Sequence, residues 1–405
     1  MLISLTNITG ARNRGVDALV SSSIAGLTKV LNGVNFAVHT NDFLFDSWRY
    51  IDTAKVIWSY LTATGDHSHS PLLNKSLYKV AQIAEKPLSK NKRIRLDTIT
   101  TIKKSDLIIP SGGDIFTSDY GNLRKHLAYV AISDRRKVYL MGHTIGPFNK
   151  KDKDDFLRSV DGIAAISARE EETFQYLKSL DVQTDVHLTA DVAFTLSTLS
   201  EYDTAQFAYR RYGFDGQQPT VALSISQGII RYSNLNAGEY YKLFAEICDY
   251  FLQQGKAIML IPHVMERNPN NNDVLACDEV LKRISVSGRV YVASGEPSAV
   301  ELKSIIGLCE GLIGTRTHAT IASMSQLVPT VSLAYSRKAY GIMTDVYGAA
   351  SAGAVTIDVK EMSASKVIDA YECTLSAPID AGRMQAIKDR AKLNFTLASK
   401  LIEGR

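Results

Sequence analysis

Residues 311–325 read GLIGTRTHATIASMS, and this stretch decides how the chain is interpreted. Residues 311–314 have the length and apolarity of a buried strand, and residues 318–325 are small and apolar, as expected of a packed helix. A strand that runs directly into a helix is the building unit of parallel α/β sheets. Arg316 and His318 then stand at the mouth of the helix, where free amides and the helix dipole favour an anion. Because both side chains have little use in packing at such a place, we favour a binding role for them.

The same alternation of strand and helix extends along the chain in both directions. Segments of strand length are 1–5, 35–39, 107–110, 137–141, 162–167, 185–188, 193–196, 220–225, 257–261, 290–292 and 330–334. Segments with helical spacing are 17–31, 170–180, 240–253, 273–284, 298–309, 338–346 and 380–401. Residues 197–218 interrupt the pattern, because they are polar and lack a strong apolar period. We therefore predict two open α/β domains, 1–200 and 215–378, followed by an amphipathic helix in 379–405.

Composition excludes several classes of protein. The chain has 405 residues, of which 45% are hydrophobic and 22% charged, and this balance excludes a mostly disordered chain. The net charge of +4 does not indicate nucleic-acid binding. The longest apolar runs, such as 328–334, are far shorter than the ~20 residues that cross a bilayer, and residues 1–9 read as a strand rather than a leader, so we expect a cytoplasmic protein. The four cysteines lie far apart and acidic residues do not cluster, so neither disulfides nor a metal site is expected.

Two turns near other strand ends are candidates for ligand binding. The turn Asn13-Arg14-Gly15-Val16-Asp17 opens a helix, and its amides suit an anion or a sugar hydroxyl, although a plain strand-to-helix turn explains it better when taken alone. In Ser111-Gly112-Gly113-Asp114 the paired glycines allow backbone to approach a ligand closely, and a tight turn explains them equally well. The glycine spacing fits neither the dinucleotide nor the P-loop fingerprint, so we reject NAD and ATP on that basis.

Basic side chains follow further strands. His143, in Gly142-His143-Thr144-Ile145-Gly146-Pro147-Phe148, is either a crevice residue or a polar turn residue. Arg169 offers a bidentate fork to a carboxylate or phosphate, or else pairs with Glu170 or Glu172. The strand 330–334 ends in Tyr335-Ser336-Arg337-Lys338, which adds positive charge to the edge that carries Arg316. Together these strand ends predict a small dianion as the ligand.

The order of these motifs resembles that of the polysaccharide pyruvyl transferase family. The matching pieces are Asn13-Arg14-Gly15-Val16-Asp17-Ala18, Ser111-Gly112-Gly113-Asp114, Gly142-His143-Thr144-Ile145-Gly146-Pro147, Ser167-Ala168-Arg169-Glu170, Ala190-Asp191-Val192-Ala193-Phe194, Ile261-Pro262-His263-Val264, Gly295-Glu296-Pro297-Ser298, Arg316-Thr317-His318-Ala319 and Tyr335-Ser336-Arg337-Lys338. Each piece is weak alone, but nine in the right order from about residue 8 to residue 348 are specific. The chain departs from the family pattern at His143, where glutamine is frequent, and at Asp114, which replaces a third glycine.

The resemblance implies a fold and a reaction. The fold is GT-B-like, with two Rossmann-like domains whose parallel sheets face a central cleft and a C-terminal helix that crosses back. The implied reaction moves pyruvate from phosphoenolpyruvate to a sugar of an exopolysaccharide or capsule, or of its lipid-linked precursor, forming a cyclic ketal and releasing phosphate. Domain 215–378 would be the donor side and domain 1–200 the acceptor side. Phosphoenolpyruvate is the co-substrate, and no further cofactor is expected.

The resemblance also implies which residues form the donor site, the acceptor site and the catalytic group. The expected donor site contains Arg316, Thr317, His318, Arg169, Tyr335 and Lys338, with Arg316, His318 and Arg169 as the catalytic group. The expected acceptor site contains Asn13, Asp17, Gly112, Gly113, Asp114, His143 and His263. His318 is the candidate acid or phosphate contact, and the base stays open between Asp17, His143 and His263.

Other readings stay open beside this one. A GT-B glycosyltransferase would place Arg316 and Lys338 on the diphosphate of a nucleotide sugar, and a non-catalytic protein would only bind a sugar or an anion. The basic run 90–95 is usually a solvated face, but it also suits anionic lipid head groups, so we add peripheral contact with the inner face of the plasma membrane as a further expectation.

Overall fold

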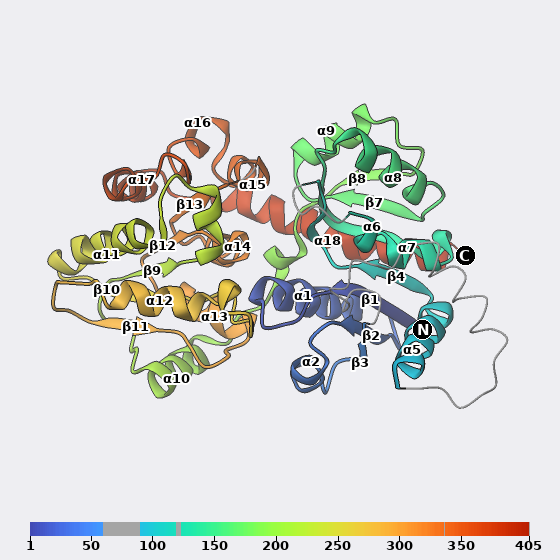
Figure 1. Ribbon diagram of the computed structural model, residues 1–405, viewed down its shortest axis with the longest axis horizontal. Coiled ribbons are helices and arrows are strands. Elements are labelled where there is room, and N and C mark those ends of the chain that lie inside the picture. The colour runs from blue at the N-terminus through green and yellow to red at the C-terminus, as the bar shows by residue number, and fades with distance from the viewer. Residues whose placement is uncertain (60–89, 119–122, 336, 405) are drawn as a thin grey trace. The chain divides into compact units, whose positions relative to one another are not determined.

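The computed structural model describes residues 1–59, 90–118, 123–335 and 337–404, and only the backbone of residues 90–95, 337 and 338 (Figure 1). The chain forms two compact units, and each is described by itself. Unit 1 consists of Met1–Ala11, Leu19–Val192 and Arg390–Arg405, and unit 2 of Arg12–Ala18 and Ala193–Asp389. The chain therefore passes from unit 1 to unit 2 after Val192, ahead of the 200–218 region where the sequence suggested a boundary. The short segment 12–18 also belongs to unit 2.

Parallel sheets form the centre of unit 1. In its described residues the strands order as β3-β2-β1-β4 and as β5-β6-β7-β8, and every pairing between them is parallel. Their bounds are β1 Leu2–Ile8, β2 Asn35–Thr40, β3 Lys55–Trp58, β4 Leu107–Pro110, β5 Gly113–Phe116, β6 Tyr139–Ile145, β7 Ala165–Ala168 and β8 Val186–Leu188. A parallel bridge between Ile108 and Val138 links the two sets of strands.

Helices cover these strands, and the end of the chain is fixed among them. The helices are α1 Arg14–Val30, which begins in unit 2, α2 Phe43–Arg49, α5 Lys90–Lys104, α6 Leu123–His126, α7 Ala128–Ile132, α8 Lys150–Val160, α9 Glu171–Ser179 and α18 Ala381–Glu403, which ends in unit 1. Asn394 of α18 is buried and accepts hydrogen bonds from Ser167 Oγ at 2.6 Å and Thr189 Oγ1 at 3.1 Å. Phe395 lies so close to Gly26 of α1 that a Cβ there would stand 2.2 Å from its ring. The final turns are therefore an integral part of unit 1, as expected of a returning C-terminal helix.

The sheet of unit 2 has the strand order of a Rossmann domain. Its described strands order as β11-β10-β9-β12-β13-β14, all parallel, which is 3-2-1-4-5-6 within this unit. Their bounds are β9 Thr220–Ser224, β10 Ala257–Leu260, β11 Val290–Val292, β12 Gly311–Gly314, β13 Thr330–Ala334 and β14 Thr356–Asp358. Because the order reverses between β9 and β12, the carboxyl ends of these two strands mark the position where such sheets bind ligands.

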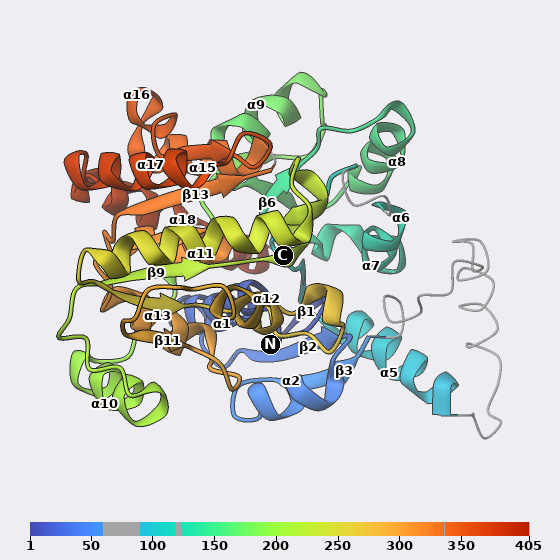
Figure 2. The same ribbon diagram turned by 60° about the vertical axis from the view of Figure 1, so that its left-hand side comes forward.

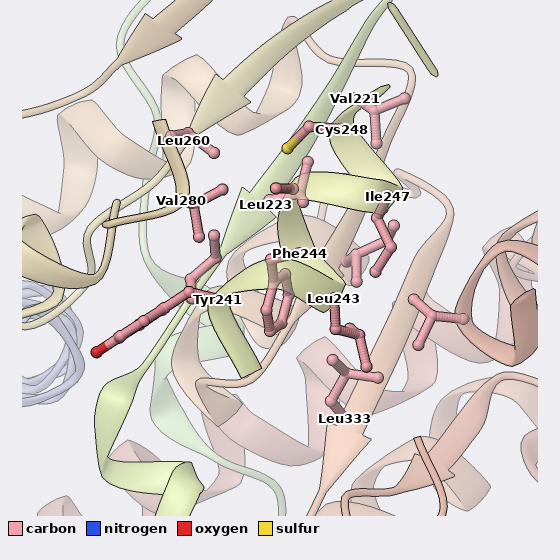
Figure 3. Close-up of a cluster of buried hydrophobic side chains, with 14 of the residues drawn as sticks. Val221, Leu223, Tyr241, Leu243, Phe244, Ile247, Cys248, Leu260, Val280 and Leu333 are labelled. Carbon is pink, nitrogen blue, oxygen red and sulfur yellow. The ribbon is translucent and has the colours of Figure 1, made fainter. Parts of the chain in front are cut away.

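Both faces of this sheet are covered by helices (Figures 1 and 2). The helices are α10 Glu201–Tyr212, α11 Ala237–Gln253, α12 Asp273–Leu281, α13 Ala299–Gly307, α14 Thr317–Met324, α15 Arg337–Tyr347, α16 Ala349–Ala352 and α17 Ala364–Ser376. Val221 and Leu223 of β9 face α11, α12 and α17, whereas Ala222 between them faces α10, α13 and α14, as strand alternation requires. Figure 3 shows Phe244 and other α11 side chains lying among those of the strands.

Three local predictions were wrong. Residues 193–196 were expected as a strand, but Val192–Thr195 form a 3-10 turn. The polar stretch expected to be irregular contains α10, which Ser200 caps at its start and Gly213 ends with a φ of 69°. Strand β6 was expected to stop at residue 141, yet it continues to Ile145, so His143 lies inside a strand rather than in a turn. Gly142 has a φ of 66° at the point where the strand register shifts. Because a glycine often ends a strand, this irregularity within β6 was mistaken for its end.

Candidate functional site

Candidate residues of unit 2 gather at the carboxyl ends of β9, β10 and β12. Thr315 follows β12 and donates from both N and Oγ1 to Ser224 O of β9, each at 2.9 Å, so the loop is tied to the point where the strand order reverses. Arg316 then caps α14 with extended backbone and gives no side-chain capping bond. The amides of the first turn of a helix lack partners within that helix. This loop therefore combines a cation with a helix start at the expected ligand position.

The guanidinium of Arg316 is held on two of its edges. Its Nε and Nη2 donate to Asp273 Oδ2 at 3.1 Å and Oδ1 at 2.7 Å, and Nη2 also donates to Asn271 Oδ1 at 3.1 Å. The Asp273 side chain is wholly buried, whereas that of Arg316 keeps 22% exposure. No hydrogen bond joins Nη1 to any of the residues that the structure describes. Among the described residues Nη1 is thus the terminal nitrogen that makes no hydrogen bond, and it suits an outside ligand.

Asp273 also fixes the loop that follows β10. Its Oδ2 accepts hydrogen bonds from His263 N at 3.2 Å and Val264 N at 2.9 Å. That loop in turn pairs with the segment at the start of α1, because Arg14 N donates to His263 O at 2.9 Å and Met265 N donates to Arg12 O at 2.9 Å. Two segments far apart in sequence, 12–15 and 263–273, are therefore joined by backbone hydrogen bonds within unit 2.

His318 packs directly against the backbone of Gly15. A Cβ added at Gly15 would stand 2.4 Å from His318 Nδ1 and 2.9 Å from Cγ, so only glycine leaves room for the imidazole. Gly15 N is held by Asn13 Oδ1 at 3.0 Å, which fixes the first turn of α1. The turn 13–17 and the Arg-x-His segment, two separate motifs in the sequence, thus meet at the imidazole of His318.

The cations around this position shift the pKa of their neighbours. Burial lowers the pKa of His263 well below its ordinary value, and the charges of His318, Arg316 and Arg14 lower it further, so this imidazole is uncharged at neutral pH. Burial lowers the pKa of Arg316 as well, but Asp273 outweighs that effect and the net pKa is raised. The site therefore keeps a permanent positive charge, while His263 contributes none.

Two other predicted residues of unit 2 have clear packing roles. Asp17 is buried and its Oδ2 accepts a hydrogen bond from Ala299 N at 2.9 Å, which supports the start of α13. Tyr335 stacks on Tyr232 with ring centroids 4.6 Å apart and an interplanar angle of 13°. The side chain of Lys338 lies outside the described residues.

Arg169 belongs to unit 1, where it forms a buried ion-pair network. Its Nη1 donates to Asp191 Oδ2 at 2.6 Å and its Nε to Thr144 Oγ1 at 2.8 Å, with Glu170 Oε2 at 3.5 Å. Its side chain is only 1% exposed. Burial raises the pKa of Glu170 to about 7 although Arg169 lowers it. The sequence left two roles open for Arg169, and the structure shows the ion pair with Glu170. The role of Arg169 in binding the donor stays a prediction.

The remaining predicted residues also lie in unit 1. His143 is wholly buried, its ring 4.8 Å from that of Phe116, and burial lowers its pKa to about 3 with a further contribution from Arg169. Gly112 is needed for packing, because a Cβ there would stand 3.1 Å from Met141 O. Gly113 has a φ of 97° and begins β5, and Asp114 is half-buried in that strand. The His143 side chain is enclosed in this conformation, and its role in binding the sugar acceptor stays a prediction.

Sequence reasoning missed Asp273 and Asn271. Residues 271–273 read as an ordinary helix start, because asparagine and aspartate are common caps. An arginine in a strand-end loop needs a carboxylate, but Asp273 is identified as that carboxylate only by the sheet order, in which β10 lies next but one to β12.

The described ranges contain neither a candidate metal cluster nor a candidate membrane-spanning helix. No three histidine, cysteine, aspartate or glutamate side chains are placed there to hold a metal ion. None of the helices in these ranges combines the length and apolarity needed to cross a membrane. The side chains of the basic run 90–95 are outside what the structure describes.

Comparisons with known proteins agree with the fold and the motif order. The sequence model of the family described as polysaccharide pyruvyl transferase matches residues 13–337. The amylovoran biosynthesis protein AmsJ of Erwinia amylovora is 22% identical over 247 residues, a match that covers 60% of this chain and only 60% of that protein.

Solved structures of similar fold include two UDP-GlcNAc 2-epimerases and a glycosyltransferase. UDP-GlcNAc 2-epimerase from Methanocaldococcus jannaschii matches with a TM-score of 0.58 at 12% identity, covering 97% of this chain and 98% of that one. The enzyme from Neisseria meningitidis bound to UDP-GlcNAc gives 0.57 at 10%, covering 97% and 98%. A glycosyltransferase from Rickettsia africae gives 0.50 at 10%, covering 100% and 96%. At these identities the likeness concerns the fold alone, and the predicted α/β fold of GT-B-like type is confirmed.

Proposed function

Because the chain belongs to the polysaccharide pyruvyl transferase family, we propose that it transfers pyruvate from phosphoenolpyruvate to two hydroxyls of a sugar, forming a cyclic ketal and releasing phosphate. The acceptor would be a polysaccharide or its lipid-linked precursor. The relative from Erwinia amylovora, a protein of amylovoran biosynthesis, supports the polysaccharide as the acceptor class. The observation that carries the proposal is the Arg316 guanidinium at the start of α14, whose Nη1 makes no hydrogen bond to the residues that the structure describes.

The proposed chemistry needs an anion site and one proton donor. Phosphoenolpyruvate offers a carboxylate and a phosphate, and Nη1 of Arg316 together with the first amides of α14 suits either group. A proton added to C3 makes C2 electrophilic, a sugar hydroxyl adds to C2 and gives up its proton, and the C2–O bond to phosphate breaks. The second hydroxyl then closes the ketal. One hydroxyl proton restores the acid and the other leaves with phosphate.

His318 is the proposed acid or phosphate contact, and its imidazole is held against Gly15 two residues after Arg316. Among the candidate bases, Asp17 already serves as a helix cap, and the strongly lowered pKa of His263 makes it a poor proton acceptor. Arg169, Tyr335 and Lys338 remain proposed donor contacts. Gly112, Gly113, Asp114 and Asn13 remain proposed acceptor contacts.

Calorimetric titration of phosphoenolpyruvate into the purified protein, with phosphate release as the activity assay, tests the proposal. We expect Arg316→Ala and His318→Ala each to lower turnover by at least ~100-fold. Since Arg316→Ala leaves the buried Asp273 without its ion pair, Arg316→Lys serves as a second variant that keeps the charge and loses the fork. Saturable binding of a UDP-sugar without binding of phosphoenolpyruvate would instead favour a glycosyltransferase.

A further inference from the structure

We infer that Asp273 is the positioning residue of the donor site, and that it sets the orientation of Arg316 and, through the backbone, the place of His318. The inference rests on the proposed function for the identity of the ligand. Its structural part concerns residues of unit 2 alone.

The hydrogen bonds of Asp273 show a carboxylate used to its capacity. Oδ1 accepts from Arg316 Nη2, and Oδ2 accepts from Arg316 Nε, His263 N and Val264 N, over 2.7–3.2 Å. A carboxylate accepts about four hydrogen bonds, and Asp273 already accepts four from the protein. With its side chain at 0% exposure, Asp273 cannot itself touch a substrate, and its role must be exerted through the groups that it holds.

The arrangement selects which edge of Arg316 meets the ligand. Asp273 takes Nε and Nη2, and Asn271 takes a further Nη2 hydrogen at 3.1 Å, so the guanidinium plane is fixed by two residues that are two apart in sequence. An arginine free to rotate would lose conformational entropy on binding, whereas this one is already ordered. The edge with Nη1 then points away from the Asp273 carboxylate.

The same carboxylate is connected to His318 by a closed path. From Oδ2 the path runs to the amides of His263 and Val264, from His263 O to Arg14 N, and from the adjoining Gly15 to the imidazole ring. His318 lies in the first turn of α14, which Arg316 caps, and this connection closes the circuit. A change at Asp273 is therefore expected to disturb both side chains at once.

A purely structural reading of Asp273 is available, because an acidic residue at the first position of α12 stabilises that helix through its dipole. The two readings differ in how substitutions combine. A residue that acts only through Arg316 loses its effect on ligand binding once Arg316 is replaced, whereas an independent effect persists and adds.

The test is a double-mutant cycle on phosphoenolpyruvate affinity with Asp273→Asn, Arg316→Lys and the double variant. The asparagine can keep the Nε, His263 and Val264 bonds through its oxygen, but its amide then faces Nη2 with a donor against a donor. We expect Asp273→Asn to weaken binding by roughly 10- to 100-fold, as for a lost charge-assisted bond. The double variant should bind no more than about twofold more weakly than Arg316→Lys. Asp278→Asn, the same change at an exposed site of α12, should leave affinity within about twofold.

A second readout keeps the inference testable whether or not phosphoenolpyruvate is the ligand. In the intact protein labelled with ¹⁵N-arginine, a slowly exchanging Nε–H resonance should vanish in Arg316→Lys and lose its protection in Asp273→Asn, but not in Asp278→Asn. Full additivity in the cycle, or an Arg316 resonance unchanged by Asp273→Asn, would overturn the positioning role. Absence of phosphoenolpyruvate binding in the wild type, with the resonance behaving as expected, would reject the proposed function and leave the positioning role standing.

Discussion

Replacing Gly15 with alanine separates the placement of His318 from the stability of the fold. The new Cβ would lie 2.4 Å from Nδ1, and an ordinary contact begins at 3.4 Å, so the ring must move by about 1 Å. A displacement of about 1 Å at a reacting group lowers rates by roughly 100-fold. Alanine itself favours the helix by up to about 1 kcal/mol over glycine, so the fold is not weakened through α1. We therefore expect Gly15→Ala to lose about two orders of magnitude in turnover while its melting temperature stays close to that of the wild type.

The assay is phosphate release from phosphoenolpyruvate in the presence of the polysaccharide acceptor, followed beside thermal unfolding. Gly353→Ala is the matched control, because a Cβ there meets nothing within 4 Å and the backbone φ of −65° suits alanine. Combined with His318→Ala, the Gly15→Ala change should cause no further loss, since the group that it displaces is already gone. Wild-type turnover in Gly15→Ala, or an equal loss in Gly353→Ala, would refute the reasoning that the glycine exists to seat the imidazole.

Three further predictions concern buried polar groups. Asn394→Leu should lower the free energy of unfolding by about 3 kcal/mol, since it removes the acceptor of the buried Ser167 hydroxyl and the donor to Ala190 O in unit 1, and thermal melting against the exposed change Thr396→Ala measures this. Burial, with a contribution from Lys388, lowers the pKa of Lys303 to about 7, so the unfolded chain binds more protons between about pH 7 and 10.5. Unfolding free energy should rise with pH across that window by up to about 1.4 kcal/mol per unit, and urea titrations of Lys303→Met should lack this part of the slope. Glu170 behaves oppositely, because burial raises its pKa to about 7 and the folded state keeps a proton that the unfolded chain releases between about pH 4.5 and 7. The contribution of Glu170 to the free energy of unfolding should fall as pH rises through that window. If the free energy of unfolding had the same pH dependence in Glu170→Gln as in the wild type, the raised pKa of Glu170 would be contradicted.

The sequence predicted where most of the strands lie along the chain, because parallel strands buried on both faces have a strong signal. Strands β4, β11, β12 and β13 have the predicted bounds, since each is a short apolar run between turn residues. The 3-10 turn at Val192–Thr195 was mistaken for a strand because four apolar or small residues carry no periodicity that separates the two. Helix α10 was missed because one side of it is exposed and its apolar stripe is short.

The site was predicted in part, for a physical reason. Arg316 and His318 could be found because a cation at a helix mouth after a buried strand has no packing use. The partners of these two residues depend on tertiary contacts, so neither the Asp273 ion pair nor the fit of His318 against Gly15 has a local signal. Arg169 illustrates the opposite case, because the same strand-end position that suggests a ligand is filled by the buried partners Asp191 and Thr144.

The central claim is that pyruvate carbon passes from phosphoenolpyruvate to the sugar, and following that carbon tests it most directly. Wild-type protein, phosphoenolpyruvate labelled with ¹³C at C2 and the polysaccharide acceptor would be incubated together, with Arg316→Lys in parallel. The account predicts that the labelled carbon appears in the polysaccharide as a ketal, with one phosphate released for each, and that Arg316→Lys strongly reduces both. Phosphate released without labelled polysaccharide, or label transferred equally well by Arg316→Lys, would contradict it.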